Sequence, residues 1–153
     1  MVRKKIVAVI GGRVCNKEVE QLAQKLGKKL SKVADILVTG GLGGVMSAIS
    51  QGFKSNGGLT IGIIPGYEKK EANDYIDIVI PTGLGLARNV LVVKTAEVVV
   101  ALPGEAGTLS EIAYCLQFAI QVISLESWDI PGVIKVKTVE QAASEVEKCL
   151  NKK

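Results

Sequence analysis

The chain of 153 residues contains no histidine. This absence excludes every catalytic triad built on histidine, the usual zinc sites and the commonest general base of enzymes. We therefore predict no metal site, and any acid–base chemistry must use another kind of side chain.

Aromatic residues are also scarce, at 4%, and the net charge of +4 comes from lysines scattered along the chain. No basic stretch is interleaved with aromatic side chains, and neither a recognition-helix pattern nor a zinc-finger pattern occurs. We therefore predict no nucleic-acid partner. The longest apolar stretch, residues 112–120, is too short to span a bilayer, so we predict no membrane partner either.

The cysteines Cys15, Cys115 and Cys149 are few, odd in number and free of any C-x-x-C pair. Such a dispersed set is typical of reduced intracellular thiols. Only five apolar residues separate the basic start of the chain from Gly11, which is too few for a signal peptide. We expect a cytoplasmic protein.

Short apolar runs alternate with helix-length amphipathic segments. Runs that are apolar on both faces are typical of parallel strands covered by helices on each side. We predict one Rossmann-like domain over residues 1–153, a three-layer α/β/α fold with a mainly parallel sheet of about six strands. The expected strands lie within residues 5–11, 35–40, 59–65, 77–81, 97–103 and 121–125, and the expected helices cover about 16–33, 45–55, 86–95, 109–120 and 138–150.

Glycines gather where three of the expected strands end. In an open α/β sheet, ligands bind beyond the carboxyl ends of the strands, and glycine lets the backbone approach them closely. Such loops contain glycine for structural reasons too, but three of them on one rim favour a nucleotide or phosphate site. The glycines are Gly11, Gly12, Gly40, Gly41, Gly43, Gly44, Gly104 and Gly107.

Two nucleotide motifs are absent. The dinucleotide fingerprint G-x-G-x-x-G, started at Gly41, fails because Met46 occupies its last position, and the G-x-x-x-x-G-K-[ST] loop does not occur. No lysine is marked as an anchor for pyridoxal phosphate. The protein is therefore predicted to be neither an ordinary dehydrogenase nor a P-loop NTPase.

The stretch PGEAGTLSE, residues 103–111, permits two interpretations. The free N–H groups of a helix that starts behind Pro103 and Gly104 would suit a phosphate. Thr108 and Glu111 also form T-x-x-E, a capping box in which Glu111 would serve only the helix start. The local sequence leaves both interpretations open.

The same stretch resembles the PGGxGTxxE motif of the LOG (Lonely Guy) proteins, a Rossmann-like superfamily long mislabelled as lysine decarboxylases. TGGLGGVMSAI (39–49), IGIIPG (61–66) and ARNVLVVKTAEVVVALPG (87–104) resemble further motifs of that superfamily, over most of residues 6–125. Two groups share the pattern. LOG enzymes hydrolyse the N-glycosidic bond of a nucleoside 5′-monophosphate to a free base and ribose 5-phosphate, whereas molybdenum cofactor carrier proteins bind a phosphorylated pterin without turnover.

The resemblance implies catalytic roles for Arg88 and Glu111. Arg88 would bind the phosphate or orient the substrate, and the Glu111 carboxylate would stabilise oxocarbenium charge and activate water. Arginines on helices more often lie in solvent without a functional role, which is the alternative for Arg88. A phosphate- or nucleotide-binding role is implied for Gly11, Gly12, Gly40, Gly41, Gly43, Gly44, Met46, Asn89, Pro103, Gly104, Gly107 and Thr108.

Three positions depart from the LOG pattern. Glu105 replaces the second glycine of the motif, Asn89 replaces the lysine of an R-K pair, and Ser110 replaces the first acid of an E-E pair. The segments RN and TLSEIA look more like the short prokaryotic branch near the carrier proteins. The resemblance therefore implies the fold more strongly than the reaction.

Three functions stay open. The first is a phosphoribohydrolase that acts on a nucleoside 5′-monophosphate. The second is a carrier of molybdenum cofactor (molybdopterin), or another protein that binds a phosphorylated ligand. The third is a nucleotide sensor that acts through its oligomer. All three have a small phosphorylated partner and require no further cofactor.

The expected helix 109–120 is apolar nearly all round, because Gln117 is the one strongly polar residue between Ile112 and Ile120. Such a helix has to be covered on two sides. The sheet covers one side, and either a second subunit or the loop 126–132 covers the other. We predict an isologous homodimer through this helix.

Overall fold

A computed structural model describes residues 1–152, which form one sheet with helices on both faces. The sheet has seven strands, all parallel, in the order β4-β3-β2-β1-β5-β6-β7. The strands are β1 (Ile6–Ile10), β2 (Ile36–Thr39), β3 (Leu59–Ile64), β4 (Ile78–Pro81), β5 (Val98–Ala101), β6 (Gln121–Leu125) and β7 (Ile134–Val136).

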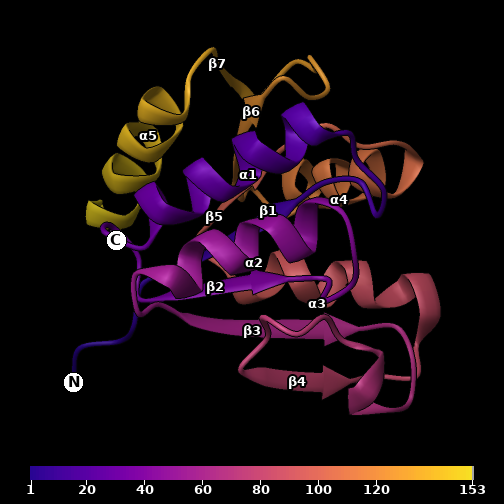
Figure 1. Cartoon of the computed structure of the whole chain (residues 1–153). Coiled ribbons are helices and arrows are strands. Elements are labelled where there is room, and N and C mark those ends of the chain that lie inside the picture. The colour runs from indigo at the N-terminus through magenta and orange to yellow at the C-terminus, as the bar shows by residue number, and fades with distance from the viewer. Residues whose placement is uncertain (153) are drawn as a thin grey trace.

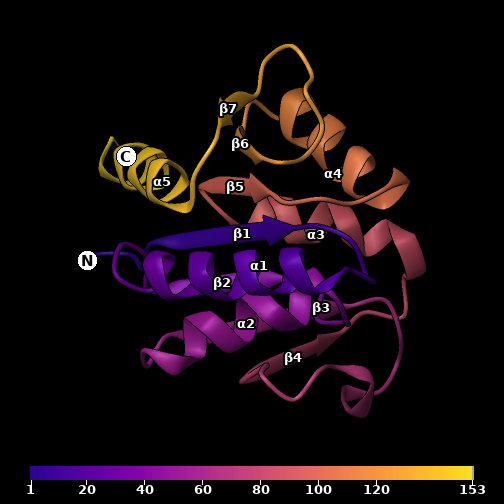
Figure 2. The ribbon, with the colours of Figure 1, turned by 45° about the horizontal axis from the view of Figure 1, so that its top comes forward.

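Two helical layers enclose this sheet (Figures 1 and 2). Helices α1 (Lys17–Leu30), α2 (Val45–Ser55) and α5 (Val139–Asn151) cover one face, and α3 (Arg88–Thr95) and α4 (Ala106–Gln117) cover the other. Two short 3₁₀ turns, η1 (Lys69–Glu71) and η2 (Gly85–Ala87), lie in the connections. Alternate residues of each central strand enter the two cores: Val7 and Val9 pack under α1 and α2, while Ala8 and Ile10 pack under α3 and α4.

The predicted strands are confirmed at all six places, and the sheet gains a seventh. Strand β7 has only three residues and joins the far edge beside β6, so it lacks the long apolar run that marks the others. Strand β4 was expected to be covered on both faces, which is wrong. It is the other edge strand, and Ile78 and Ile80 are 45% and 44% exposed.

Two predicted helix starts are confirmed by their caps. The Asn16 side chain accepts a hydrogen bond from the Val19 N–H (2.9 Å) at the start of α1, and Thr138 accepts one from the Gln141 N–H (3.1 Å) at the start of α5. The Gln141 side chain accepts in turn from the Lys137 N–H (2.8 Å). Helix α2 ends at Ser55, as predicted, and is followed by Asn56 and the positive-φ Gly57.

Glycines let α1 and α2 approach each other closely. A Cβ at Gly52 would lie 2.1 Å from the Gln24 carbonyl oxygen, and one at Gly27 would lie 2.5 Å from the Ile49 carbonyl oxygen. This packing positions α2 and the glycine loop before it.

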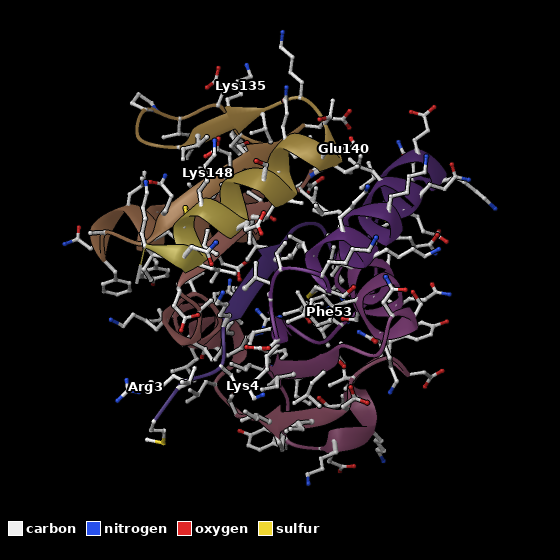
Figure 3. The ribbon with its side chains drawn as sticks, turned by 90° about the vertical axis from the view of Figure 1, so that its left-hand side faces the viewer. Arg3, Lys4, Phe53, Lys135, Glu140 and Lys148 are labelled. Carbon is white, nitrogen blue, oxygen red and sulfur yellow. The ribbon has the colours of Figure 1, made fainter. Side chains whose placement is uncertain are left out.

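In Figure 3, Phe53 lies enclosed by the helices and sheet, whereas Lys135 and Lys148 project outward. Within residues 1–152, no helix combines the length and apolarity needed to cross a bilayer.

Candidate ligand-binding site

A cavity of about 570 Å³ lies at the carboxyl ends of β1, β2 and β5. This is the edge at which open α/β sheets bind ligands, and the volume falls within the range of small-molecule sites. Its lining comes from the loops after those three strands, from the start of α3 and from the first turns of α4.

Backbone hydrogen bonds join the three loops into one rim. The Gly12 N–H donates to the Pro103 carbonyl (2.8 Å), and the Val45 N–H donates to the Gly12 carbonyl (2.9 Å). Side chains would not fit at the glycines where these loops contact one another. A Cβ at Gly104 would lie 2.0 Å from the Thr108 hydroxyl oxygen, and one at Gly12 would lie 2.9 Å from the Val14 carbonyl oxygen.

Most of the predicted site residues line this one cavity. They are Gly11, Gly12, Gly40, Met46, Arg88, Asn89, Pro103, Gly104, Gly107, Thr108 and Glu111.

Three predicted glycines do not line it and instead shape the loop between β2 and α2. Gly41 has a φ of +77°, and its N–H donates to the Thr39 hydroxyl (3.0 Å). Gly44 has a φ of +61°, and a Cβ there would lie 2.4 Å from the Gly12 carbonyl oxygen. A Cβ at Gly43 would lie 3.2 Å from the Arg13 carbonyl oxygen.

Sequence reasoning missed part of the lining. The position of the segment directly after Gly11 and Gly12 could have predicted some of these residues, because any residue at the end of β1 borders the carboxyl edge of the sheet. The missed residues are Val9, Ile10, Arg13, Val14, Cys15, Asn16, Val19, Leu42, Pro65 and Leu86; Glu105, noted only as a departure, lines the cavity as well.

Of the two interpretations of residues 103–111, the capping box is wrong. The helix begins at Ala106, with Glu105 at the N-cap position and no side-chain cap bond, so Thr108 lies inside the first turn. The first intrahelical bond runs from the Leu109 N–H to the Glu105 carbonyl (3.0 Å). The N–H groups of residues 106–108 precede it and have no partner within the helix, which leaves this end suited to an anion.

Arg88 is buried and lines the cavity, so the alternative that it is a solvated helix arginine is wrong. The residue is only 7% exposed. Its Nη1 donates to the Asn89 amide oxygen, and its Nη2 donates to the Gly40 carbonyl (3.4 Å). Its Nε has no hydrogen-bond partner among residues 1–152. A buried charged donor left unpaired is costly, and an anionic ligand would relieve that cost.

Glu111 shares the cavity and is also 7% exposed. Burial raises the pKa of Glu111 to about 8, against the opposing effect of the Arg88 charge. Burial likewise lowers the pKa of Arg88, with Glu111 acting to raise it and Arg13 to lower it. Glu111 is therefore mostly protonated at neutral pH and can donate a proton from within the cavity.

Arg88 and Glu111 form no ion pair within 4 Å in the part of the chain that the structure describes. Their mutual effect on pKa nevertheless requires them to be near one another. The two groups thus face one cavity without neutralising each other. Within residues 1–152, no group of three or more cysteine or acidic side chains is arranged to hold a metal ion.

The outer side of α4 is only partly covered. The loop 126–132 contributes, since a Cβ at Gly132 would lie 3.0 Å from the Leu116 side chain. Even so, Tyr114, Leu116 and Phe118 are each 38–39% exposed. Tyr114 and Phe118 stack with ring centroids 6.1 Å apart, and the Lys94 ammonium lies 4.7 Å from the Phe118 ring centroid.

The chain is similar over most of its length to several known proteins. It is 38% identical over 139 residues to an uncharacterized protein of Archaeoglobus fulgidus, covering 90% of this chain and 91% of that one. It is 30% identical over 100 residues to a probable cytokinin riboside 5′-monophosphate phosphoribohydrolase of Oryza sativa subsp. japonica. That match covers 63% of this chain and 44% of the rice protein.

Among solved structures, the molybdenum cofactor binding protein of Rippkaea orientalis is similar with a TM-score of 0.88 and 33% identity, covering 97% of this chain and 98% of that one. The molybdenum cofactor carrier protein of Chlamydomonas reinhardtii has the same TM-score and 32% identity, covering 97% and 99%. DNA processing protein A of Helicobacter pylori, at 17% identity and a TM-score of 0.73, shares the fold alone.

The residues that carry the LOG resemblance thus lie around one cavity, on a fold similar to that of molybdenum cofactor carriers. A family model described as the SLOG cluster4 family matches residues 4–152. The chain therefore belongs to the SLOG cluster4 family, a LOG-like branch near the molybdenum cofactor carrier proteins.

Proposed function

We propose that this protein binds a molybdopterin-type cofactor in the cavity at the carboxyl edge of the sheet and carries it without chemical change. The observation that carries the proposal is the similarity, over 97% of the chain, to proteins described as binding or carrying molybdenum cofactor. The similarity to the rice phosphoribohydrolase extends over 63%.

The cavity fits a ligand with one phosphate. The start of α4 presents three N–H groups that no intrahelical bond uses, and the helix dipole adds positive potential there. Arg88 lines the same cavity with an unpaired Nε–H. The apolar residues Val9, Leu42 and Leu86 also line it and can contact the flat faces of a heterocycle.

Glu105 lies at the mouth of this site, where the LOG pattern has glycine. It is exposed and occupies the N-cap position of α4. Its carboxylate repels a phosphate unless the side chain turns toward solvent, as its exposure permits.

A second function, hydrolysis of a nucleoside 5′-monophosphate, is favoured by the meeting of Arg88 and Glu111 in one cavity. With a pKa of about 8, Glu111 would act at neutral pH as an acid that protonates the leaving base. This differs from the expected carboxylate role, which needs the ionised form.

The deciding experiment loads the purified protein with molybdenum cofactor released from a molybdoenzyme and then adds a cofactor-free acceptor enzyme. Carriage predicts stoichiometric binding and recovery of acceptor activity. In parallel, a panel of nucleoside 5′-monophosphates is assayed for free base. Base release at enzymatic rates, without cofactor binding, would overturn the carrier in favour of the hydrolase.

Gly107 provides a matched pair of variants for the phosphate end. A Cβ there meets nothing within 4 Å, so side chains fit without a clash. Gly107→Asp brings a negative charge to the helix start, which stabilises α4 but repels a phosphate. We expect it to weaken cofactor binding by roughly a hundredfold or more relative to Gly107→Asn, while its melting temperature does not fall. Equal binding by the two variants would contradict a phosphate at this helix end.

We further propose that the exposed apolar residues at the end of α4, Tyr114, Leu116 and Phe118, form the contact of a homodimer. We also propose that the protein is cytoplasmic and has no nucleic-acid partner. Sedimentation equilibrium of wild type and of Tyr114→Lys tests the dimer. The wild type is expected to dimerise and the variant to dissociate, and a wild type that stays monomeric at high concentration would contradict the proposal.

A further inference from the structure

Two of the three departures from the LOG pattern are in contact with each other. Asn89 lies at the start of α3 and Ser110 lies in α4, 21 positions later. The Asn89 side-chain N–H donates to the Ser110 hydroxyl oxygen (3.4 Å), and that hydroxyl donates to the Gly107 carbonyl (2.6 Å). The two replacements therefore form one interaction across α3 and α4.

The amide oxygen of the Asn89 side chain accepts a hydrogen bond from Arg88. The Asn89 amide oxygen accepts from the Arg88 Nη1, and the Arg88 Nη2 donates to the Gly40 carbonyl (3.4 Å) in the loop after β2. Asn89 is 3% exposed, so little water competes for these bonds. Each Nη thereby uses one of its N–H groups, and the unpaired Nε–H is a buried donor open to a ligand.

We propose that Asn89 and Ser110 are a positioning pair, which fixes the Arg88 guanidinium beside Glu111 and toward the bound phosphate. This inference deepens the proposed function and rests on it for the identity of the ligand. The LOG resemblance implies a phosphate- or nucleotide-binding role for Asn89. Because its side chain contacts both Arg88 and Ser110, we assign it an effect on the ligand through Arg88.

An amide suits this position because it accepts and donates at once. Leucine has a similar size and neither group. A lysine here would donate only, and two donors facing each other would push the guanidinium away. The chain that links the Gly107 carbonyl, Ser110, Asn89 and Arg88 also couples the arginine to the first turn of α4, where the phosphate is proposed to bind.

The first test needs no ligand. Carboxyl carbons of glutamate are followed by NMR against pH in wild type, Asn89→Leu, Ser110→Ala and Ser110→Thr. The Arg88 charge acts to lower the pKa of Glu111. If the pair holds Arg88 in place, Asn89→Leu releases it and the pKa of Glu111 rises by about half a unit or more. Ser110→Ala should produce a smaller rise, and Ser110→Thr, which keeps the hydroxyl, none.

The second test uses molybdenum cofactor as the probe. Asn89→Leu is expected to weaken its binding by roughly tenfold to a hundredfold, the cost of one displaced charge-assisted hydrogen bond. The same variant should leave the binding of a pterin that lacks the phosphate unchanged, a selectivity that a merely structural role would not produce. Equal losses for both probes would overturn the inference.

The titration and the binding measurement distinguish a failure of the positioning pair from a failure of the proposed function. If wild type fails to bind the cofactor, the proposed function is wrong, and the titration of Glu111 still tests the pair. If Glu111 titrates alike in wild type and Asn89→Leu, the pair does not position Arg88, whatever the ligand. Should Asn89→Leu not fold, an unchanged titration in Ser110→Ala overturns the inference by itself.

Discussion

The acidic residues at the two ends of the sheet are used in opposite ways. At the amino ends, Asp35, Asp77 and Glu97 each stand directly before a strand, and each accepts a hydrogen bond from a backbone N–H at or next to the start of a neighbouring strand. The distances are 2.7 Å from the Lys5 N–H to Asp35, 3.0 Å from the Thr60 N–H to Asp77, and 2.7 Å from the Ile6 N–H to Glu97. At the carboxyl ends, Glu111 is buried without an ion pair among the described residues.

Asp77 and Glu111 show what the difference means for ionisation. Burial alone would raise the pKa of Asp77, but hydrogen bonds from Lys54 and Thr60 lower it below its usual value. Burial dominates at Glu111 and raises its pKa to about 8, because no comparable donors compensate. Donors around an acid stabilise the fold, whereas a buried acid without them destabilises the ionised folded state and marks a candidate functional site.

The largest expected effect is that of Glu111→Gln on stability at high pH. The unfolded chain loses the Glu111 proton above about pH 4.5, and the folded chain loses it above about pH 8. Between these values the folded state holds the extra proton, so this group lowers stability as pH rises. A glutamine side chain cannot ionise, so the variant should be more stable than wild type at pH 9, by at most about 5 kcal/mol.

At pH 4.5 the two proteins should unfold at nearly the same urea concentration, since both side chains are largely neutral in the folded state. Urea titrations at pH 4.5, 7 and 9 measure the difference. A gap that does not widen with pH would mean that Glu111 ionises normally in the fold, and the contrast between the two ends of the sheet would fail.

A smaller effect of opposite sign is expected for Asp77→Asn. The amide can still accept from the Thr60 N–H but loses its charge toward Lys54, which also hydrogen-bonds this carboxylate. We expect a loss of about 0.5–1 kcal/mol at pH 7. Because the pKa of Asp77 is lowered, this stabilisation is present above about pH 3.8 and disappears as pH falls through the folded-state value.

Urea titrations of Asp77→Asn and Lys54→Met at pH 7 and pH 3 test this. The two variants should lose similar amounts at pH 7, and both losses should be smaller at pH 3. A loss that persists undiminished at pH 3 would assign the effect to packing and not to charge.

The smallest effect is expected for Asp35→Asn. Asp35 is exposed, and the hydrogen bond that it accepts from the Lys5 N–H can be accepted by an amide oxygen as well. The free energy of unfolding should change by less than about 0.5 kcal/mol, which urea titration at pH 7 measures. A change as large as that of Asp77→Asn would show that the ion pair with Lys54 does not separate these two acids.

Much of the fold follows from local patterns in the sequence. The six longer strands are runs of branched apolar residues, and the caps Asn16 and Thr138 mark helix starts by hydrogen bonds that reach only three residues ahead. The glycine loops also predicted the ligand-binding edge of the sheet, because the carboxyl ends of neighbouring parallel strands necessarily lie side by side.

Features that depend on distant segments were mistaken or missed. The capping-box pattern around Thr108 is locally sound, yet α4 begins at Ala106, so the pattern is not used as a cap. The exposure of Ile78 and Ile80 follows from the edge position of β4, which no run of four residues reveals. Arg13 and Leu86 line the cavity only because the folded chain brings their loops together, which the sequence does not reveal.

The sequence by itself determined the alternation of strands and helices and the edge of the sheet at which the glycines gather, because periodicity and backbone freedom are local properties. Only the tertiary structure decided the state of Arg88 and Glu111. Their burial and the bond between Asn89 and Ser110 arise where α3, α4 and the loops after β1 and β2 converge. The ionisation of a group depends on the solvent and charges around it in space, and these come from segments far apart in the chain.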